Sequence, residues 1–181
     1  PLITKADGTR FGKSEGGAIW LNPEMLSPYA FYQFWLQVDD ADVVRFLKVF
    51  TFLEREEVER LETATAENPK AREAQRVLAH EVCMWVHGAD ATAQAEAATS
   101  ALWGRGDLTD IDEATILAAT SDLASSDVTV GQTTIVDLLV GTGLERGRNA
   151  ARKTIAGGGA YLNNVKVADE AAVIGPEHLL A

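Results

Sequence analysis

Apolar residues recur at helical spacing through the first two thirds of the chain. Behind the cap residue Ser27, the aromatic residues Phe31, Phe34 and Trp35 and the aliphatic Val38 stand at positions i, i+3, i+4 and i+7. This spacing places them on one face of a helix. The polar, glycine-rich stretch 5–17 before it has no such period and is predicted to be a loop.

Further apolar periods behind capping residues predict more helices, with no convincing strand up to residue 120. We expect these helices to begin at Asp40, Glu54, Asn68-Pro69, Asp90 and Thr109. The helix behind Asn68-Pro69 is the clearest and should end at Gly88. Its predicted inward face consists of Val77, Leu78, Val82, Trp85 and Val86.

The pattern changes after residue 120. Residues 121–131 are rich in serine, aspartate and threonine and are predicted to form a linker. Two short helices are expected at 134–140 and 145–156, followed by three glycines. The stretch 160–167 then predicts a strand, a tight turn at Asn163-Asn164 and a second strand. The fold class is therefore mainly α, with a helical domain followed by a small α+β domain.

Charge is distributed unevenly along this chain of 181 residues, whose formal net charge is -11. Residues 142–167 carry a net charge of +4, while the rest of the chain is acidic. An acidic chain is not a general nucleic-acid binder, and its acidic remainder would confine a bound nucleic acid to particular faces. No apolar stretch approaches the length that spans a membrane. The single cysteine, Cys83, allows no internal disulfide and fits a reducing compartment.

One short motif carries candidate chemistry. Residues 10–14 read Arg-Phe-Gly-Lys-Ser and resemble the second signature of class I aminoacyl-tRNA synthetases, with Arg10 where the family usually has lysine. Cations such as Arg10 and Lys13 stabilise the charge that builds up on departing pyrophosphate, and Gly12 permits close backbone approach to phosphate. A P-loop is excluded, because only three residues separate Gly8 from Gly12 and no long apolar strand precedes them.

The segments around this motif resemble bacterial tyrosyl-tRNA synthetases along the whole chain. The similarity rests on residues 1–4, 15–21, 27–35, 50–53 and 86–88. It implies that Lys13 and Arg10 act in catalysis and that Lys13, Ser14 and Gly12 bind ATP. It also implies a helical anticodon-binding domain and, in the whole enzyme, Mg²⁺, tyrosine and tRNA(Tyr) as ligands. A homodimer and a cytoplasmic location are further expectations from the family.

The C-terminal segment resembles an RNA-binding domain shared with a small-subunit ribosomal protein, on residues 136–140, 148–155, 159–163 and 165–167. Arg148 and Arg152 are one helical turn apart, and the planar guanidinium suits phosphate oxygens. The predicted RNA-binding residues are Arg146, Arg148, Arg152, Lys153 and Lys166. The family domain continues with another strand or two, so we expect residues 132–181 to be an incomplete copy.

The resemblance predicts four parts: the end of a catalytic domain at 1–16, the anticodon-binding domain at 17–120, a linker at 121–131 and the small RNA-binding domain. The chain has no initial methionine, so we expect it to begin inside a longer protein. On its own it is expected to be inactive, because the nucleotide-binding sheet and tyrosine pocket of the family lie before the signature loop. A stand-alone RNA-binding fragment is the alternative, and a nucleotide switch using Lys13 is a remote third.

Two further residue sets are interpreted without a ligand. His80, Cys83 and His87 can share a helix face, but i and i+7 are separated by about 10 Å along a straight helix, too far to hold one metal ion. No metal site is therefore predicted. The tryptophans lie mostly in apolar patterns and are predicted to be core residues, although an exposed indole would be able to stack on an RNA base. They are Trp20, Trp35, Trp85 and Trp103.

Overall fold

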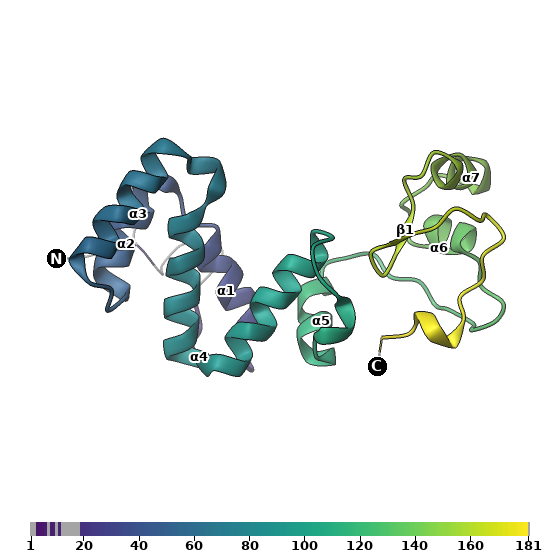
Figure 1. Ribbon diagram of the computed structural model, residues 1–181. Helices are drawn as coiled ribbons and strands as arrows, with labels where there is room; N and C mark the ends of the chain where they lie inside the picture. Colours follow the sequence, from purple (N-terminus) through teal and green to yellow (C-terminus); the bar gives the residue numbers. More distant parts are fainter. Residues whose placement is uncertain (1–2, 7, 10, 12–18, 181) are drawn as a thin grey trace. The chain divides into compact units, whose positions relative to one another are not determined.

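The computed structural model describes residues 3–6, 8–9, 11 and 19–180. It divides the chain into two compact units, which we describe separately: unit 1 comprises residues 1–96 and unit 2 residues 97–181 (Figure 1). Helices dominate both units, and the described strands form one short hairpin in unit 2. The predicted fold class, mainly α with a small α+β part, is confirmed. The four domain boundaries stay a prediction.

Unit 1 is built from helices that begin close to the predicted positions. They are α1 (Pro28–Leu36), α2 (Asp40–Phe50), α3 (Arg55–Glu67), the 3-10 turn η1 (Pro69–Ala71) and α4 (Glu73–Leu102). The Ser27 hydroxyl accepts a hydrogen bond from the Ala30 amide at 3.2 Å, as expected of a cap. Proline at the first position of α1 lacks only an amide proton that the helix leaves unused there.

The long helix α4 departs from the prediction at its start and at its middle. Residues 69–71 form a separate 3-10 turn, because Arg72 adopts a left-handed conformation with φ of 49° and separates that turn from Glu73. At the predicted break, Gly88 has φ of 84° and ψ of 177°, and helical geometry resumes directly after it. The predicted break is confirmed, but Asp90 lies within the renewed helix and does not cap it.

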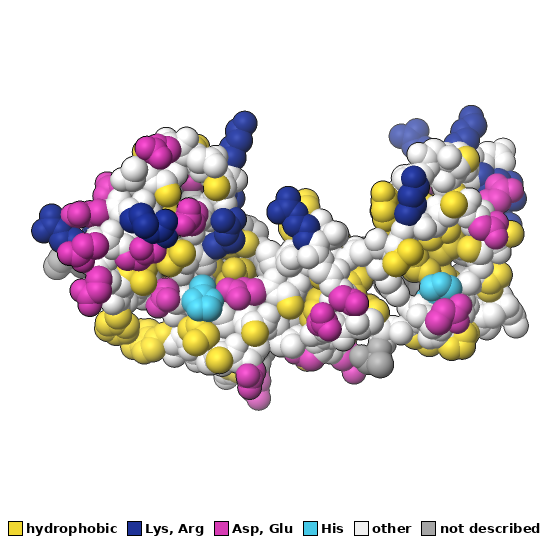
Figure 2. All heavy atoms as spheres, in the orientation of Figure 1, with side chains coloured by type: hydrophobic (Ala, Val, Ile, Leu, Met, Phe, Trp, Pro, Cys, Tyr) yellow, Lys and Arg dark blue, Asp and Glu magenta, His cyan; other side chains and the backbone are white. Residues whose placement is uncertain are grey.

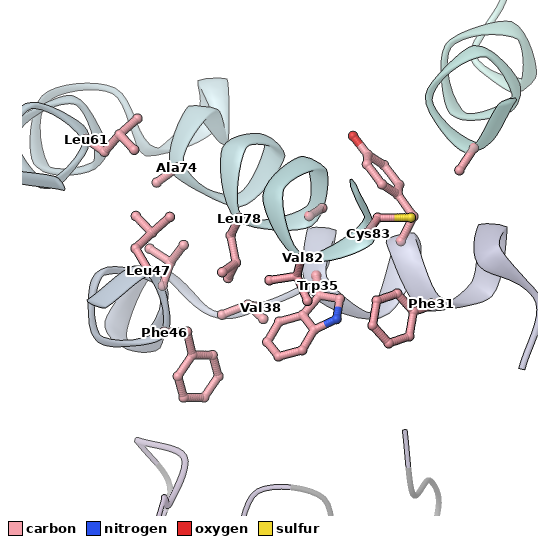
Figure 3. Packing of buried hydrophobic residues seen from close by; sticks show 14 of the residues in the cluster. Phe31, Trp35, Val38, Phe46, Leu47, Leu61, Ala74, Leu78, Val82 and Cys83 are labelled. Atoms are coloured by element: carbon pink, nitrogen blue, oxygen red, sulfur yellow. The ribbon is translucent and has the colours of Figure 1, made fainter. Parts of the chain in front are cut away.

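The core of unit 1 combines aromatic and aliphatic side chains and lies between α1, α2, α3 and α4 (Figure 3). Phe31, Trp35 and Phe46 are each no more than 3% exposed, and Leu78 and Val82 of α4 pack against them. The prediction for α4 is wrong at Trp85, whose side chain is 71% exposed and contacts the Phe52 ring edge-on at 5.3 Å. Trp85 therefore belongs to a surface patch with Phe52, while the helix turns Leu78 and Val82 inward.

Unit 2 contains the last turns of α4 and the remaining elements of the chain. These are η2 (Leu108–Asp110), α5 (Glu113–Thr120), α6 (Ile135–Gly141), α7 (Arg148–Ala156), β1 (Tyr161–Leu162), β2 (Val165–Lys166) and η3 (Pro176–His178). The predicted cap at Thr109 is wrong: Asp112 caps α5 by accepting from the Thr115 amide at 2.7 Å. Residue 109 instead lies in η2, which Asp107 caps.

The small α+β part of unit 2 packs α6 against α7 beside the hairpin. The predicted strand–turn–strand is confirmed: β1 and β2 are antiparallel, with Tyr161 opposite Lys166. Asn163 and Asn164 form the turn with φ of 49° and 63°, a conformation that asparagine tolerates well. The hydrophobic cluster contains only small and aliphatic buried residues: Ile135, Val136, Ala151, Ile155, Ala160 and Ile174.

Candidate functional site

The signature motif is described at one position. Arg10, Gly12, Lys13 and Ser14 lie outside the described residues, so their predicted roles at ATP stay a prediction. Phe11 lies within the described part, and its ring is surrounded by aromatic side chains of α1 and α2. The ring centroids are 5.1 Å from Phe46, 5.2 Å from Phe50, 5.5 Å from Trp35 and 5.8 Å from Phe34. Phe11 thus ties the motif to the core of unit 1.

Backbone hydrogen bonds support the described residues before Phe11. The Phe11 amide donates to the Ile3 carbonyl at 3.0 Å, and the Lys5 amide donates to the Thr9 carbonyl at 2.8 Å. The Ala6 amide donates to the carboxylate of Asp42 at 2.9 Å. Asp42 lies on α2, is 3% exposed and also accepts from Arg45. The segment is therefore attached to α2 through a buried carboxylate as well as through the Phe11 ring.

The five predicted RNA-binding residues all lie in the small part of unit 2, and all five are exposed. Arg146 precedes α7, Arg148, Arg152 and Lys153 lie on α7, and Lys166 lies on β2. The space-filling view shows dark-blue basic side chains gathered over the region where Figure 1 places α7 (Figure 2). The structure therefore collects the predicted set on one small module, although the contacts of its members differ.

Arg148 is engaged inside the module. Its guanidinium donates to the carboxylate of Asp137 on α6. The same carboxylate accepts from the amide and hydroxyl of Thr134, which completes a capping box at the start of α6. The hydrogen bonds from Thr134, supported by the positive charge of Arg148, hold the pKa of Asp137 below its ordinary value. Arg148 thus links the beginnings of two helices.

Arg152 is also paired, but more loosely. Its Nε atom is 3.5 Å from a carboxylate oxygen of Glu170, and both side chains are about half exposed, at 47% and 59%. Such exposed pairs contribute little to stability, so Arg152 is available to exchange Glu170 for a phosphate. The acidic Glu145 lies before α7, and its carboxylate accepts from the Thr154 hydroxyl. Glu145 therefore supports the fold of the helix.

Three of the five residues are free to meet a ligand. Within residues 19–180, neither Arg146 nor Lys153 nor Lys166 forms an ion pair or a hydrogen bond through its side chain. Lys166 extends across Gly158, because a Cβ atom added there would lie 2.3 Å from its Nζ atom. Gly158 has φ of 74°, so the glycine both turns the chain after α7 and leaves room for the lysine.

Three of the four tryptophans are exposed, although their apolar surroundings in the sequence predict core residues. Trp35 is buried as predicted, but Trp20, Trp85 and Trp103 are 48%, 71% and 81% exposed. The apolar pattern misled because an amphipathic stripe does not reveal where the packed face of a helix ends. Gly104, directly after Trp103, predicts that the helix stops there, and this helix end was the available sign that residue 103 lies beyond the packed turns.

The His–Cys set on α4 is accounted for by packing. His80 contacts Glu96 through Nδ1 at 2.8 Å, and burial raises the pKa of the Cys83 thiol. His87 meets the Phe31 ring edge-on at 4.7 Å, and burial lowers its pKa. Across the described ranges, no three His, Cys, Asp or Glu side chains are grouped so that they would hold a metal ion. No described helix is long and apolar enough to cross a membrane.

Comparison with known proteins places this arrangement in a class. Residues 1–104 match the family model described as "tRNA synthetases class I (W and Y)", and the chain belongs to that family. Residues 115–181 match the "Tyrosine--tRNA ligase SYY-like C-terminal domain". The predicted resemblance to bacterial tyrosyl-tRNA synthetases is therefore confirmed.

Individual relatives agree with the second match. The chain is 57% identical over 180 residues to the tyrosine–tRNA ligase of Streptomyces avermitilis and 56% identical over 175 residues to that of Nocardia farcinica. These alignments cover 99% and 93% of this chain but only 42% and 41% of the relatives. A C-terminally truncated mitochondrial tyrosyl-tRNA synthetase of Coccidioides posadasii has 38% identity and a TM-score of 0.45, over 52% of this chain and 24% of that one.

Proposed function

We propose that this chain is the part of a tyrosine–tRNA ligase that holds tRNA(Tyr) and supplies the phosphate loop for tyrosine activation. The observation that carries the proposal is the basic surface of unit 2, where Arg146, Lys153 and Lys166 have no side-chain partner among the described residues of an acidic chain. Structured RNA presents phosphates that such a basic surface can neutralise. Residues 17–120 serve as the anticodon-binding domain and residues 132–181 as the small RNA-binding domain.

In the whole enzyme, Lys13 and Arg10 stabilise the charge that develops on pyrophosphate as ATP reacts with tyrosine, and Mg²⁺ accompanies ATP. Gly12 and Ser14 contribute to binding the phosphates. The support for this assignment is the family match together with the attachment of Phe11, whose ring is held by four aromatic side chains beside the motif. The enzyme works as a homodimer in the cytoplasm, as its family does.

The RNA-binding proposal is tested on the chain with a tRNA(Tyr) transcript. Replacing Arg146, Lys153 and Lys166 together by alanine removes three phosphate contacts. The slope of log K against log salt should then fall by about 2 to 3 units, because each neutralised phosphate contributes 0.7 to 0.9. The matched control replaces Lys48, Arg55 and Lys70 of unit 1, which removes the same charge elsewhere. An unchanged slope in the unit 2 triple variant would refute a site in unit 2, whereas a loss in the unit 1 variant would report separate contacts of the helical domain.

The loop proposal needs the full-length enzyme. Lys13→Ala should slow tyrosine-dependent ATP–pyrophosphate exchange by about 100-fold, as removal of one group that stabilises transition-state charge does. Its affinity for tRNA(Tyr) should stay within twofold of the parent enzyme by filter binding. If Lys13→Ala showed a normal rate of ATP–pyrophosphate exchange, whatever its affinity for tRNA, the assignment of Lys13 to the phosphate site would be wrong.

A second candidate function is a stand-alone fragment that binds structured RNA without catalysis. The exposed basic surface favours it to the same degree, because RNA binding by unit 2 makes no use of the loop. ATP–pyrophosphate exchange separates the two: the ligase proposal requires activity once the upstream part of the enzyme is restored, and the chain alone should show none. Exchange by the chain alone would contradict both readings.

A further inference from the structure

Trp103 is the most exposed tryptophan of the described chain, yet its backbone is tightly held. It lies one residue after the end of α4, and its amide donates to the Ser100 carbonyl at 3.2 Å. The Arg105 amide donates to the same carbonyl at 3.1 Å, and the Ser100 hydroxyl donates to the Arg105 carbonyl at 3.1 Å. Gly104 makes the tight turn possible with φ of 71°. The indole is thus displayed outward, 81% exposed, from a hydrogen-bonded turn.

The hairpin of the RNA-binding module is attached to this turn. The side-chain amide of Asn164 donates to the Ala101 carbonyl at 2.8 Å and to the Gly106 carbonyl at 3.2 Å, so it brackets Trp103 on both sides. The same hairpin carries Lys166 two residues later. Trp103 and the predicted phosphate-binding lysine therefore belong to one hydrogen-bonded assembly within unit 2.

The charges around Trp103 discriminate between parts of a nucleic acid. Arg105 stands two residues away in the same turn and is exposed, so it provides a second planar group that is able to stack on a base. Asp107 and Asp110 follow closely and disfavour a phosphate at this place. An unpaired base has no charge, and it stacks on an indole or a guanidinium plane. The site therefore fits a base better than it fits the sugar–phosphate backbone.

We propose that Trp103 and Arg105 form a stacking site for one unpaired base of the structured RNA that unit 2 binds, and that Asn164 is the residue that positions this site. The inference rests on the proposed function, because the basic surface brings the RNA to unit 2. The stacking site recognises a base that is not paired in a helix. The basic residues, in contrast, recognise only phosphate. RNA with a loop or bulge is then preferred over continuous duplex RNA.

The test compares the chain and its variants with a tRNA(Tyr) transcript and with a blunt duplex RNA of equal length. Trp103→Ala should weaken tRNA binding by about 5- to 100-fold, the range for loss of one base–aromatic stack, and leave the salt slope unchanged. Duplex binding should stay within twofold. Trp103→Phe should retain most of the affinity, and Trp85→Ala, which removes the other highly exposed indole, should have no effect on either RNA.

A fluorescence measurement keeps the test independent of folding defects in the alanine variant. Saturating tRNA should quench the tryptophan emission of the chain, and the part of the quenching that Trp103→Phe removes reports stacking on residue 103. Quenching of equal size in both proteins would overturn the proposal, as would an unchanged tRNA affinity of Trp103→Ala. An equal loss of duplex and tRNA binding would also overturn it, because the contact would then not be to an unpaired base.

The positioning role of Asn164 has its own matched pair of variants. Asn164→Gly keeps the left-handed turn but removes the two bonds to the helix end, and Asn163→Gly removes the bond to the His178 carbonyl instead. Only Asn164→Gly should weaken tRNA binding, by about 5-fold, with duplex binding unchanged. Weaker binding of Asn164→Gly to both the tRNA and the duplex would show that Asn164 has a purely structural role.

The two proposals fail separately. If the triple basic variant bound tRNA normally, the proposed function itself would fail. If only Trp103→Ala bound tRNA normally, this inference alone would fail.

Discussion

The two units of this chain achieve order by different means. Unit 1 buries Phe31, Tyr32, Trp35 and Phe46 in one aromatic cluster, whereas the buried cluster of the small module in unit 2 contains no aromatic residue. The module relies on a capping box, on the Arg148–Asp137 pair and on asparagine side chains that bind backbone carbonyls. A small core held by polar contacts leaves long basic side chains at the surface, which suits a module that binds an anion.

The largest expected effect belongs to the aromatic core. Phe46→Ala should lower the free energy of unfolding of unit 1 by about 3 to 5 kcal/mol, because a phenyl ring that is 2% exposed leaves a cavity among its neighbours. Urea denaturation followed by circular dichroism measures the change. Phe52→Ala, at a ring that is 80% exposed, should change stability by less than about 0.5 kcal/mol. Similar losses in both variants would show that the cluster is not the stabilising core.

A smaller effect is expected at the glycine beneath Lys166. Gly158→Ala should destabilise unit 2 by about 1 to 2 kcal/mol, because an L-residue with φ of 74° is strained and its Cβ would meet the lysine. Thermal unfolding measures the loss, and RNA binding should weaken as Lys166 is displaced. Gly106→Ala is the control, because its Cβ would make only ordinary contacts of 3.4 Å or more with Ala101. No difference between the variants would contradict the close approach.

The capping box of α6 should contribute less still. Thr134→Ala removes the hydroxyl that accepts from the Asp137 amide and should cost unit 2 about 1 kcal/mol. Thr134→Ser keeps that hydroxyl and should cost much less, so the pair isolates the cap from the methyl group. Because the pKa of Asp137 is lowered in the folded chain, its contribution is complete above its ordinary pKa of 3.8 and is lost as the pH falls below that value. Denaturation of both variants at pH 7 and pH 3 measures these differences.

The smallest predicted effect is a pH dependence in unit 1. Burial lowers the pKa of His87 from its ordinary value of 6.5, so the folded state favours the neutral imidazole beside Phe31. The free energy of unfolding is therefore unaffected by His87 above pH 6.5. It declines as the pH falls below that value, because the imidazole takes up a proton more readily in the unfolded chain than in the folded one. His87→Phe should flatten the dependence between pH 7 and pH 5. An unchanged slope would assign the dependence to other groups.

Much of the fold was accessible from the sequence because its helix starts carry strong local signals. Ser27-Pro28 and Thr134 act as the caps that their types predict, and Asn163-Asn164 makes the expected turn. The start at Thr109 was wrong because Asp107 and Asp112 act as caps on either side of it, and the start at Asn68 was wrong because the left-handed Arg72 separates its turn from α4. Local pattern alone does not show which of these residues acts as the cap.

The sequence predicted which basic residues lie on the small module of unit 2, but not which of them form ion pairs there. The five basic residues lie on one module, as expected, but no local pattern indicates that Arg148 is bound to Asp137, eleven residues earlier. Exposure of Trp103 was also missed, because a tryptophan after an alanine-rich helix resembles a core residue until the turn that presents it is known. Pairing and presentation depend on contacts between elements, which periodicity does not encode.

The break in α4 sets a requirement of handedness at one position. At Gly88, φ of 84° and ψ of 177° lie where L-amino acids are rarely found, and nothing stands within 4 Å of an added Cβ. Mirror-image backbone angles fall in the ordinary extended region, so the position is suited to an achiral or a D-residue. Bulk is not the obstacle there; chirality is. Among the twenty genetically encoded amino acids, only glycine meets that requirement without strain.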